Sequence, residues 1–97
     1  MSATQVAPAN LKEKTMAKYT MAVTVMMTGT AAHKIRKFEE FGLCKPARTT
    51  SRQRLYSDSD IELIRQISSL EKDHVNLPGI KIILAIQTSQ KNRKKGG

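Results

Sequence analysis

The sequence predicts a mainly α-helical domain with one small β-hairpin, and three observations indicate this fold class. Apolar residues recur at helical spacing in several segments, and a capping residue or a glycine bounds most of them. Between two of these segments, Arg52, Arg54 and Tyr56 occupy every second position after a proline, which is typical of a strand in a hairpin. The length of 97 residues suits a single domain.

A first helix is predicted over residues 21–28, MAVTVMMT. The stretch is apolar on nearly all sides and is followed by Gly29, a residue that often closes helices, so a short buried helix is expected. The β-branched residues at its centre leave a strand as the alternative. Residues 1–18 mix small and polar side chains with few large apolar groups and are interpreted as a disordered arm.

A second helix is predicted from about residue 30 to residue 41, after which a glycine stops it. Thr30 is the expected N-terminal cap. Ile35 and Phe38, with Ala31 as a further candidate, would face the core. The polar residues of the outer face would be His33, Lys34, Arg36 and Lys37.

The hairpin is expected over about residues 43–56, and a third helix begins after it at Ser57. The Ser57 hydroxyl would cap this helix, and Asp58 and Asp60 in its first turn suit the positive end of the helix dipole. The inward face would consist of Ile61, Ile64, Ile67 or Ser68, and Leu70 or Glu71.

A fourth helix is predicted after Asn76, a further N-terminal cap. Pro78 lies near its start, where a missing N–H costs little. The apolar stripe of this helix would consist of Ile80, Ile83, Leu84 and Ile86 or Gln87. Residues 88–97 are rich in Lys and Arg and are interpreted as a basic flexible tail.

The charge of the chain is strongly basic and unevenly distributed. Seventeen Lys and Arg against eight Asp and Glu give a net charge of +9, with a pI near 10.1. Residues 31–56 carry seven basic and two acidic side chains, whereas residues 57–75 carry two basic and five acidic ones. This alternation indicates a folded body with a basic binding face, for which nucleic acid is the first expected partner and an acidic membrane surface the second.

The order of the elements predicts a winged helix-turn-helix over residues 19–87. A short helix, a glycine turn and a basic helix form the helix-turn-helix, and the hairpin that follows is its wing. The helix over residues 30–41 would be the recognition helix, and residues 43–56 would form the wing.

The stretch that carries the basic helix and the hairpin resembles a known family. It reads HKIRKFEEFGLCKPARTTSRQRLYSDSDIELIRQISSL and resembles the N-terminal domain of the MerR transcription regulators, whose pattern runs roughly R-Y-Y-E-x-x-G-L-[apolar]-x-P-x-R, a variable gap and R-x-Y-S. The matching residues are Arg36, Phe38, Glu39, Gly42, Leu43, Pro46, Arg48, Arg54, Tyr56 and Ser57. The following VNLPGIKIIL is similar to members of the nitrogen-regulator and heat-shock-repressor type.

The resemblance implies sequence-specific binding of double-stranded DNA and regulation of transcription. This chain departs from the family where Lys37 replaces the first tyrosine and Ala31 replaces the serine that usually starts the recognition helix. Typical members continue into a long coiled-coil dimerisation helix and an effector domain, beyond the region of resemblance, so no sensor function or small-molecule effector site is carried over. A homodimer and a cooperative array on DNA both stay open.

The expected DNA contacts lie on the recognition helix and the wing. They are Ala32, His33, Lys34, Arg36, Lys37, Arg48, Arg52, Arg54 and Tyr56. The helix residues would face base edges in the major groove, and the wing arginines would grip flanking phosphates or the minor groove. Arg36 is alternatively held by Glu39 or Glu40. A strand would point Arg52 and Arg54 the same way.

Some of these positions have a second interpretation, and other functions find little support. Tyr56 is either a core residue beneath the wing or a hydrogen-bond donor to phosphate. Cys44 is interpreted as a small buried thiol, and neither His33 nor His74 has other ligands at metal-binding spacing. No metal, cofactor or enzymatic activity is therefore expected.

The apolar stretch of residues 21–27 is far too short to span a membrane. We expect a cytoplasmic, nucleoid-associated protein. Two alternatives to a sequence-specific regulator are a nucleoid-type protein that coats DNA with low specificity and a binder of structured RNA.

Overall fold

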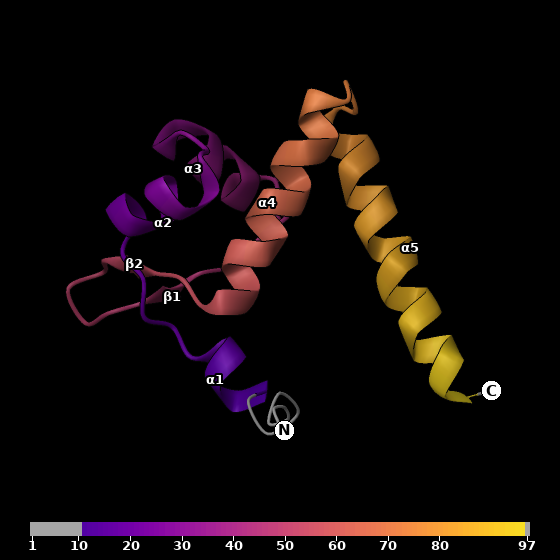
Figure 1. Ribbon diagram of the computed structural model, residues 1–97, viewed down its shortest axis with the longest axis horizontal. Helices are drawn as coiled ribbons and strands as arrows, with labels where there is room; N and C mark the ends of the chain where they lie inside the picture. The colour runs from indigo at the N-terminus through magenta and orange to yellow at the C-terminus, as the bar shows by residue number, and fades with distance from the viewer. Residues whose placement is uncertain (1–10, 97) are drawn as a thin grey trace, which may run out of the picture. The chain divides into compact units, whose positions relative to one another are not determined.

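The computed structural model describes residues 11–96, which form two compact units. The first unit contains α1 (Leu11–Thr15), α2 (Met21–Thr28), α3 (Ala32–Glu40), β1 (Ala47–Arg48) and β2 (Arg54–Leu55) (Figure 1). α4 (Asp58–Lys72) begins in the first unit and continues into the second, which also contains α5 (Leu77–Gly96). The predicted fold class, mainly α-helical with a small hairpin in a winged helix-turn-helix, is confirmed.

α2 begins and ends where its sequence predicts. The hydroxyl of Thr20 accepts a hydrogen bond from the N–H of Val23 at 3.3 Å, and Gly29 closes the helix with a left-handed φ of 66°. The expected burial of the whole helix is wrong, since Thr24 is its buried residue and Met26 is 82% exposed. The helix is two turns long and packs along one side on α3, so only one stripe of it is covered (Figure 1).

The N-terminal cap of α3 is not the predicted one. Thr30 is buried, and its hydroxyl donates to the carbonyl of Thr28 at 3.4 Å instead of turning to the helix. Ala31 occupies the cap position in an extended conformation and makes no side-chain bond there. Ala31 is exposed, so its expected place in the core is also wrong, whereas Ile35 and Phe38 are fully buried as predicted.

A glycine directs the chain from α3 into the wing. Gly42 has a left-handed φ of 79°, its N–H donates to the carbonyl of Glu39, and the N–H of Leu43 donates to that of Phe38, both at 2.9 Å. This pair of bonds is the Schellman ending, in which the residue after the glycine packs back onto the helix. Leu43 and Phe38 are both buried, so the turn also contributes to the core.

The segment before α2 lies against the end of the hairpin. β1 and β2 are antiparallel, with Ala47 opposite Leu55. Tyr19 then forms an isolated antiparallel bridge with Tyr56, in which the N–H of Tyr56 donates to Tyr19 at 2.7 Å and the N–H of Tyr19 donates back at 2.9 Å. The backbone of Lys18 donates to the same Tyr56 carbonyl at 2.9 Å.

Part of the expected N-terminal arm is structured in this unit. Residues 1–10 lie outside the described residues, whereas Leu11–Thr15 form α1. Lys14 and Lys18 make ion pairs with Glu62 at 3.3 Å and with Asp58 at 3.4 Å. Both acids lie on the first turns of α4, so basic side chains of the arm meet the acidic start of that helix.

The start of α4 has the predicted cap. The N–H of Asp60 donates to the Ser57 hydroxyl at 3.1 Å, and the N–H of Ser57 donates to the Asp60 carboxylate at 2.9 Å. This reciprocal pair is a capping box with aspartate in the third position. Asp58 accepts a 2.6 Å hydrogen bond from the Tyr19 hydroxyl, which together with Lys18 lowers the pKa of the Asp58 carboxyl.

The second unit contains the turn between α4 and α5. His74 has a left-handed φ of 68°, and the bonds from His74 to Glu71 and from Val75 to Leu70 form another Schellman ending, here without glycine. The predicted cap of α5 is confirmed, because Asn76 accepts a hydrogen bond from the N–H of Gly79 at 2.9 Å.

The predicted apolar stripe of α5 is covered on its first turns. Ile80 is fully buried and Ile83 is half-buried, whereas Ile86 is 51% exposed. Its alternative, Gln87, accepts a hydrogen bond from Gln66 at 2.8 Å. α5 extends to Gly96, across most of the segment for which a flexible tail was expected.

The core of the first unit is small and mostly aliphatic. Its buried apolar residues are Ile35, Phe38, Leu43, Cys44, Tyr56, Ile61 and Ile64. Burial raises the pKa of the Cys44 thiol to about 12, so it is a small apolar group, as predicted, and not a reactive thiolate.

A buried hydroxyl gives a test of packing in α2. Thr24 is fully buried, and its hydroxyl has no hydrogen-bond partner in the described part of the chain. Such a group costs roughly 1–3 kcal/mol, and valine has the same shape without it. Thr24→Val is therefore expected to raise the free energy of unfolding by about 1 kcal/mol in urea denaturation.

Thr28→Val is the matched control on the same helix. Its hydroxyl donates to the Thr24 carbonyl at 2.8 Å and accepts from the N–H of Thr30 at 3.2 Å, so this change is expected to lower stability. A Thr24→Val chain less stable than the wild type would contradict the assignment.

The capping box of α4 gives a further test. Ser57→Ala removes the hydroxyl that accepts the Asp60 N–H and is expected to lower the free energy of unfolding by about 1 kcal/mol. Ser59→Ala, two residues into the helix, is the control and should change stability by less than about 0.5 kcal/mol. Equal stability of the two variants would show that the cap contributes nothing.

Candidate nucleic-acid interface

The outer face of α3 presents basic side chains to solvent. Its inner face is fixed by Ile35 and Phe38, which are fully buried. The helical period then places the polar residues of this segment outward, and all four are exposed: His33, Lys34, Arg36 and Lys37. Ala32, at the first position of the helix, is half-buried.

The tip of the wing is a tight turn that ends in a left-handed residue. Thr49 accepts a backbone bond from Arg52 at 2.8 Å, and its hydroxyl accepts one from the N–H of Gln53 at 3.1 Å. Arg52 has a φ of 66° and is exposed. The prediction that Arg52 and Arg54 share one strand is wrong, because β2 begins at Arg54 and the left-handed turn interrupts the pleat before it.

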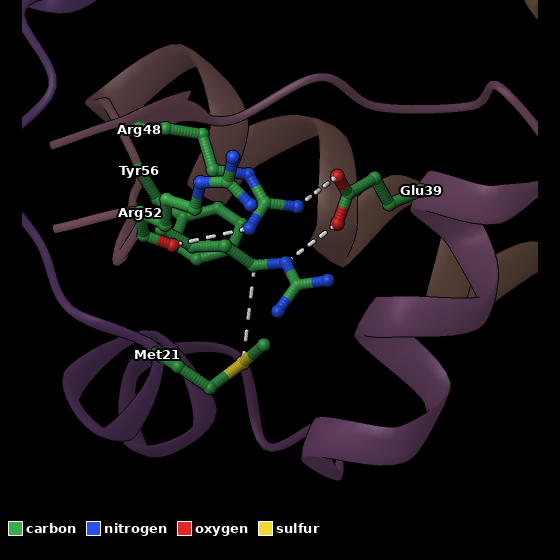
Figure 2. A network of polar contacts seen from close by, with 6 residues as sticks. Met21, Glu39, Arg48, Arg52 and Tyr56 are labelled. Carbon is green, nitrogen blue, oxygen red and sulfur yellow. Dashed lines mark hydrogen bonds and ion pairs between the residues drawn. The ribbon is translucent and has the colours of Figure 1, made fainter. Parts of the chain in front are cut away.

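One carboxylate joins α3 to both strands of the wing. Glu39 accepts a 2.6 Å hydrogen bond from Nε of Arg54 through Oε1 and a 3.0 Å bond from Nη2 of Arg48 through Oε2. Figure 2 shows Glu39 projecting from α3 toward Arg48. The Nη1 of Arg48 also donates to the carbonyl of Arg52 at 3.2 Å. The wing is therefore tied to α3 and also across its own tip.

This arrangement sets the electrostatics of the site. Burial alone raises the pKa of Glu39, but the hydrogen bonds and positive charges of Arg54 and Arg48 outweigh it, so the pKa lies below the ordinary carboxyl value. The same hydrogen bond raises the pKa of Arg54. The alternative in which Glu39 holds Arg36 is not observed, because both carboxylate oxygens face the wing arginines.

Tyr56 is a core residue and not a surface donor. Its side chain is fully buried, and its hydroxyl donates to the sulfur of Met21 at 3.9 Å (Figure 2). Burial is also the main reason that its pKa rises to about 12. Of the two interpretations of Tyr56, the core residue is right and the phosphate contact is wrong.

The site thus presents exposed basic side chains in two places, on the outer face of α3 and at the tip of the wing. The four polar residues of the outer face of α3 come together as predicted, and Arg52 stands apart from them at the tip of the wing. Arg48 and Arg54 lie between the two and have internal partners. Lys45, an exposed cation at the entrance to the wing, was not among the predicted contacts, although its charge and its place before a proline were visible in the sequence.

No cluster of three or more His, Cys, Asp or Glu side chains between residues 11 and 96 has the arrangement of a metal site. Within the same residues, no helix combines the length and the apolar character needed to cross a membrane.

Comparisons with known proteins agree with this geometry. Residues 19–86 match the family described as MerR HTH family regulatory protein. The chain is 39% identical over 70 residues to the putative heat shock protein HspR of Streptomyces coelicolor, across 71% of this chain and 46% of that protein.

Two further relatives are transcriptional regulators by name. The HTH-type transcriptional regulator GlnR of Bacillus anthracis is 31% identical over 72 residues, across 74% of this chain and 56% of that protein. The HTH-type transcriptional regulator MlrA of Salmonella typhimurium is 30% identical over 76 residues, across 77% of this chain and 31% of that protein. The chain spans about half the length of the first two relatives and less of the third.

The shared carboxylate gives a pH-dependent test. Because the pKa of Glu39 lies below its ordinary value of 4.5, its contribution to stability is fully present above that pH and is lost as the pH falls through the lowered value. Arg54→Gln is expected to move the pKa of Glu39 upward in an NMR titration of the carboxyl carbon. Arg52→Gln is the control and should leave it unchanged. An unaltered titration in the Arg54 variant would contradict the pairing.

Proposed function

The chain belongs to the family of MerR HTH regulatory proteins, and we propose that it regulates transcription by binding double-stranded DNA in a sequence-specific way. The observation that carries this proposal is the exposed basic face of α3 beside a wing of defined geometry. A helix of this width fits the major groove, where base edges differ for each base pair.

On this proposal, α3 reads bases from its outer face. Ala32, His33, Lys34 and Lys37 lie nearest to base edges, and Arg36 contacts a base or the adjacent phosphate. Lysine and arginine are suited to the acceptors of guanine in the major groove. In this chain Lys37 can reach either a base edge or a phosphate.

The wing contacts the DNA backbone through its tip. Arg52 is exposed and its guanidinium has no partner among the described residues, so it is the wing arginine most available to phosphate. Arg48 and Arg54 share the Glu39 carboxylate, which reduces the positive charge that they present. Lys45 adds a further exposed cation at the entrance to the wing.

A regulator differs from the alternative functions in its footprint and its substrate preference. A protein that coats DNA protects a probe without fixed edges, whereas a sequence-specific regulator protects a bounded site. A binder of structured RNA is favoured by competition with duplex RNA over duplex DNA. Two-fold symmetry of the protected site would support a homodimer, and direct repeats would support a cooperative array.

The proposal is tested by fluorescence anisotropy on a duplex that contains the protected site. The four cations of the proposed face, Lys34, Arg36, Lys37 and Arg52, are expected to neutralise about four DNA charges and to give a slope of log K against log salt of about −3.6, since each contributes near 0.9. Absence of binding at low salt, or a flat salt response, would refute the proposal.

Charge-matched variants locate the interface. Arg36→Ala and Lys37→Ala are each expected to weaken binding by at least about fivefold at moderate salt, because each removes a contact worth roughly 1–3 kcal/mol. Lys81→Ala removes the same charge from an exposed position on α5 and is expected to bind as the wild type does. Equal losses in all three variants would indicate a general effect of charge and no defined face.

A further inference from the structure

The wing contains three arginines, but the structure uses them differently. Arg54 directs its Nε to one oxygen of Glu39, and Arg48 directs Nη2 to the other oxygen and Nη1 to a backbone carbonyl. The guanidinium of Arg52 makes no such contact with any described residue, and its side chain is exposed. From this difference we infer that Glu39 is a specificity-determining residue, which withholds Arg48 and Arg54 from the phosphate backbone. The inference rests on the DNA binding proposed above.

The carboxylate occupies the position that a phosphate would take between the two guanidiniums. At 2.6 and 3.0 Å, both bonds have the length of charge-assisted hydrogen bonds. The exposed fraction of the side chain is 21% for Glu39 and 26% for Arg54, so the pair is partly shielded from water and from salt. Arg54 gives only its Nε to Glu39, so a DNA phosphate that approaches the outer nitrogens of either arginine does so beside this internal anion, which repels it and weakens the contact.

The contact that occupies Arg48 also displays Arg52. Nη1 of Arg48 donates to the carbonyl oxygen of Arg52, in a turn where Arg52 holds a φ of 66°. The bond uses the main chain of Arg52 and leaves its side chain free to point outward. One arginine is thus used internally to fix the backbone from which another reaches the ligand.

Withholding two cations changes specificity because phosphate contacts carry no sequence information. Two freed guanidiniums would strengthen binding to every DNA sequence alike and would lower the ratio of specific to non-specific affinity. The carboxylate limits this common contribution, so base contacts from α3 form a larger share of the binding free energy.

The direct test compares Glu39→Gln with Glu40→Gln on a duplex without the protected site. Both changes remove one negative charge from neighbouring positions of α3, but Glu40 is exposed and makes no contact with the wing arginines. Glu39→Gln is expected to bind more tightly at low salt and to steepen the slope of log K by about 0.9–1.8, for one or two freed arginines. Equal slopes in the two variants, or weaker binding by Glu39→Gln at every salt concentration, would overturn the inference.

A reciprocal set of variants tests the same point with Glu39 in place. Arg48→Gln and Arg54→Gln are expected to keep the wild-type salt slope, whereas Arg52→Gln is expected to reduce its magnitude by about 0.9. Two-dimensional NMR spectra check that each variant is folded. A loss of slope in the Arg48 or Arg54 variant equal to that of Arg52→Gln would show that those arginines do contact phosphate.

Inorganic phosphate separates this inference from the proposed function. If the wild type fails to bind duplex DNA, the proposed function is wrong, yet the two-arginine site can still be measured directly. At constant ionic strength, phosphate is expected to raise the Tm of Glu39→Gln more than that of the wild type or of Glu40→Gln, because the vacated guanidiniums accept an anion. The same small shift in all three proteins would contradict the withheld arginines.

Discussion

The ion pairs of Glu39 are the constraint on which the geometry of the site depends. One carboxylate on α3 binds Arg48 from β1 and Arg54 from β2, so α3 and the wing are held in a single arrangement. An exposed pair of this kind contributes at most about 1 kcal/mol, but here both oxygens are used, and Glu39 and Arg54 are partly buried. On the proposed function this rigidity matters more than the free energy of the ion pairs, because α3 and the wing would meet one DNA duplex together.

The base of the wing is stabilised by contacts of Tyr19, Tyr56 and Ser57. The backbone of Tyr19 pairs with that of Tyr56, whose side chain fills the core under the hairpin. Ser57 follows Tyr56 directly and caps α4. Two adjacent residues therefore provide the backbone bridge, a buried core side chain and the helix cap. A hairpin with only two paired residues in each strand is marginal alone, and this added bridge and cap stabilise its base.

Local signals in the sequence predicted the ends of the elements well. The bounds of α2, the glycine turn after α3, the Ser57 cap and the Asn76 cap each depend on residues within a few positions of one another, and the structure contains all of them. Two predictions failed at positions that are equally local, where a competing hydrogen bond or a left-handed backbone decides the conformation. Thr30 is buried against its own turn and does not cap α3, and the left-handed Arg52 breaks the expected alternation of the wing.

The sequence also predicted only part of how the charged residues are arranged. Period and charge placed the basic residues on the outer face of α3, because a helix fixes its faces locally. The two arginine partners of Glu39 could not be predicted in this way, since they lie on strands that are nine and fifteen residues away along the chain. The ion pairs of Lys14 and Lys18 with the start of α4 could not be predicted for the same reason, since their partners are distant in the sequence. These contacts hold part of the segment that was expected to be a disordered arm.

We infer that α3 and the tip of the wing form one DNA-binding face, and an NMR titration of the labelled chain with duplex DNA can locate that face residue by residue. The largest amide shifts are expected within residues 32–37 and at Arg52, while the exposed acidic side of α4 around Glu62 stays unchanged. Shifts centred on α4 or α5, or no shifts at low salt, would contradict it.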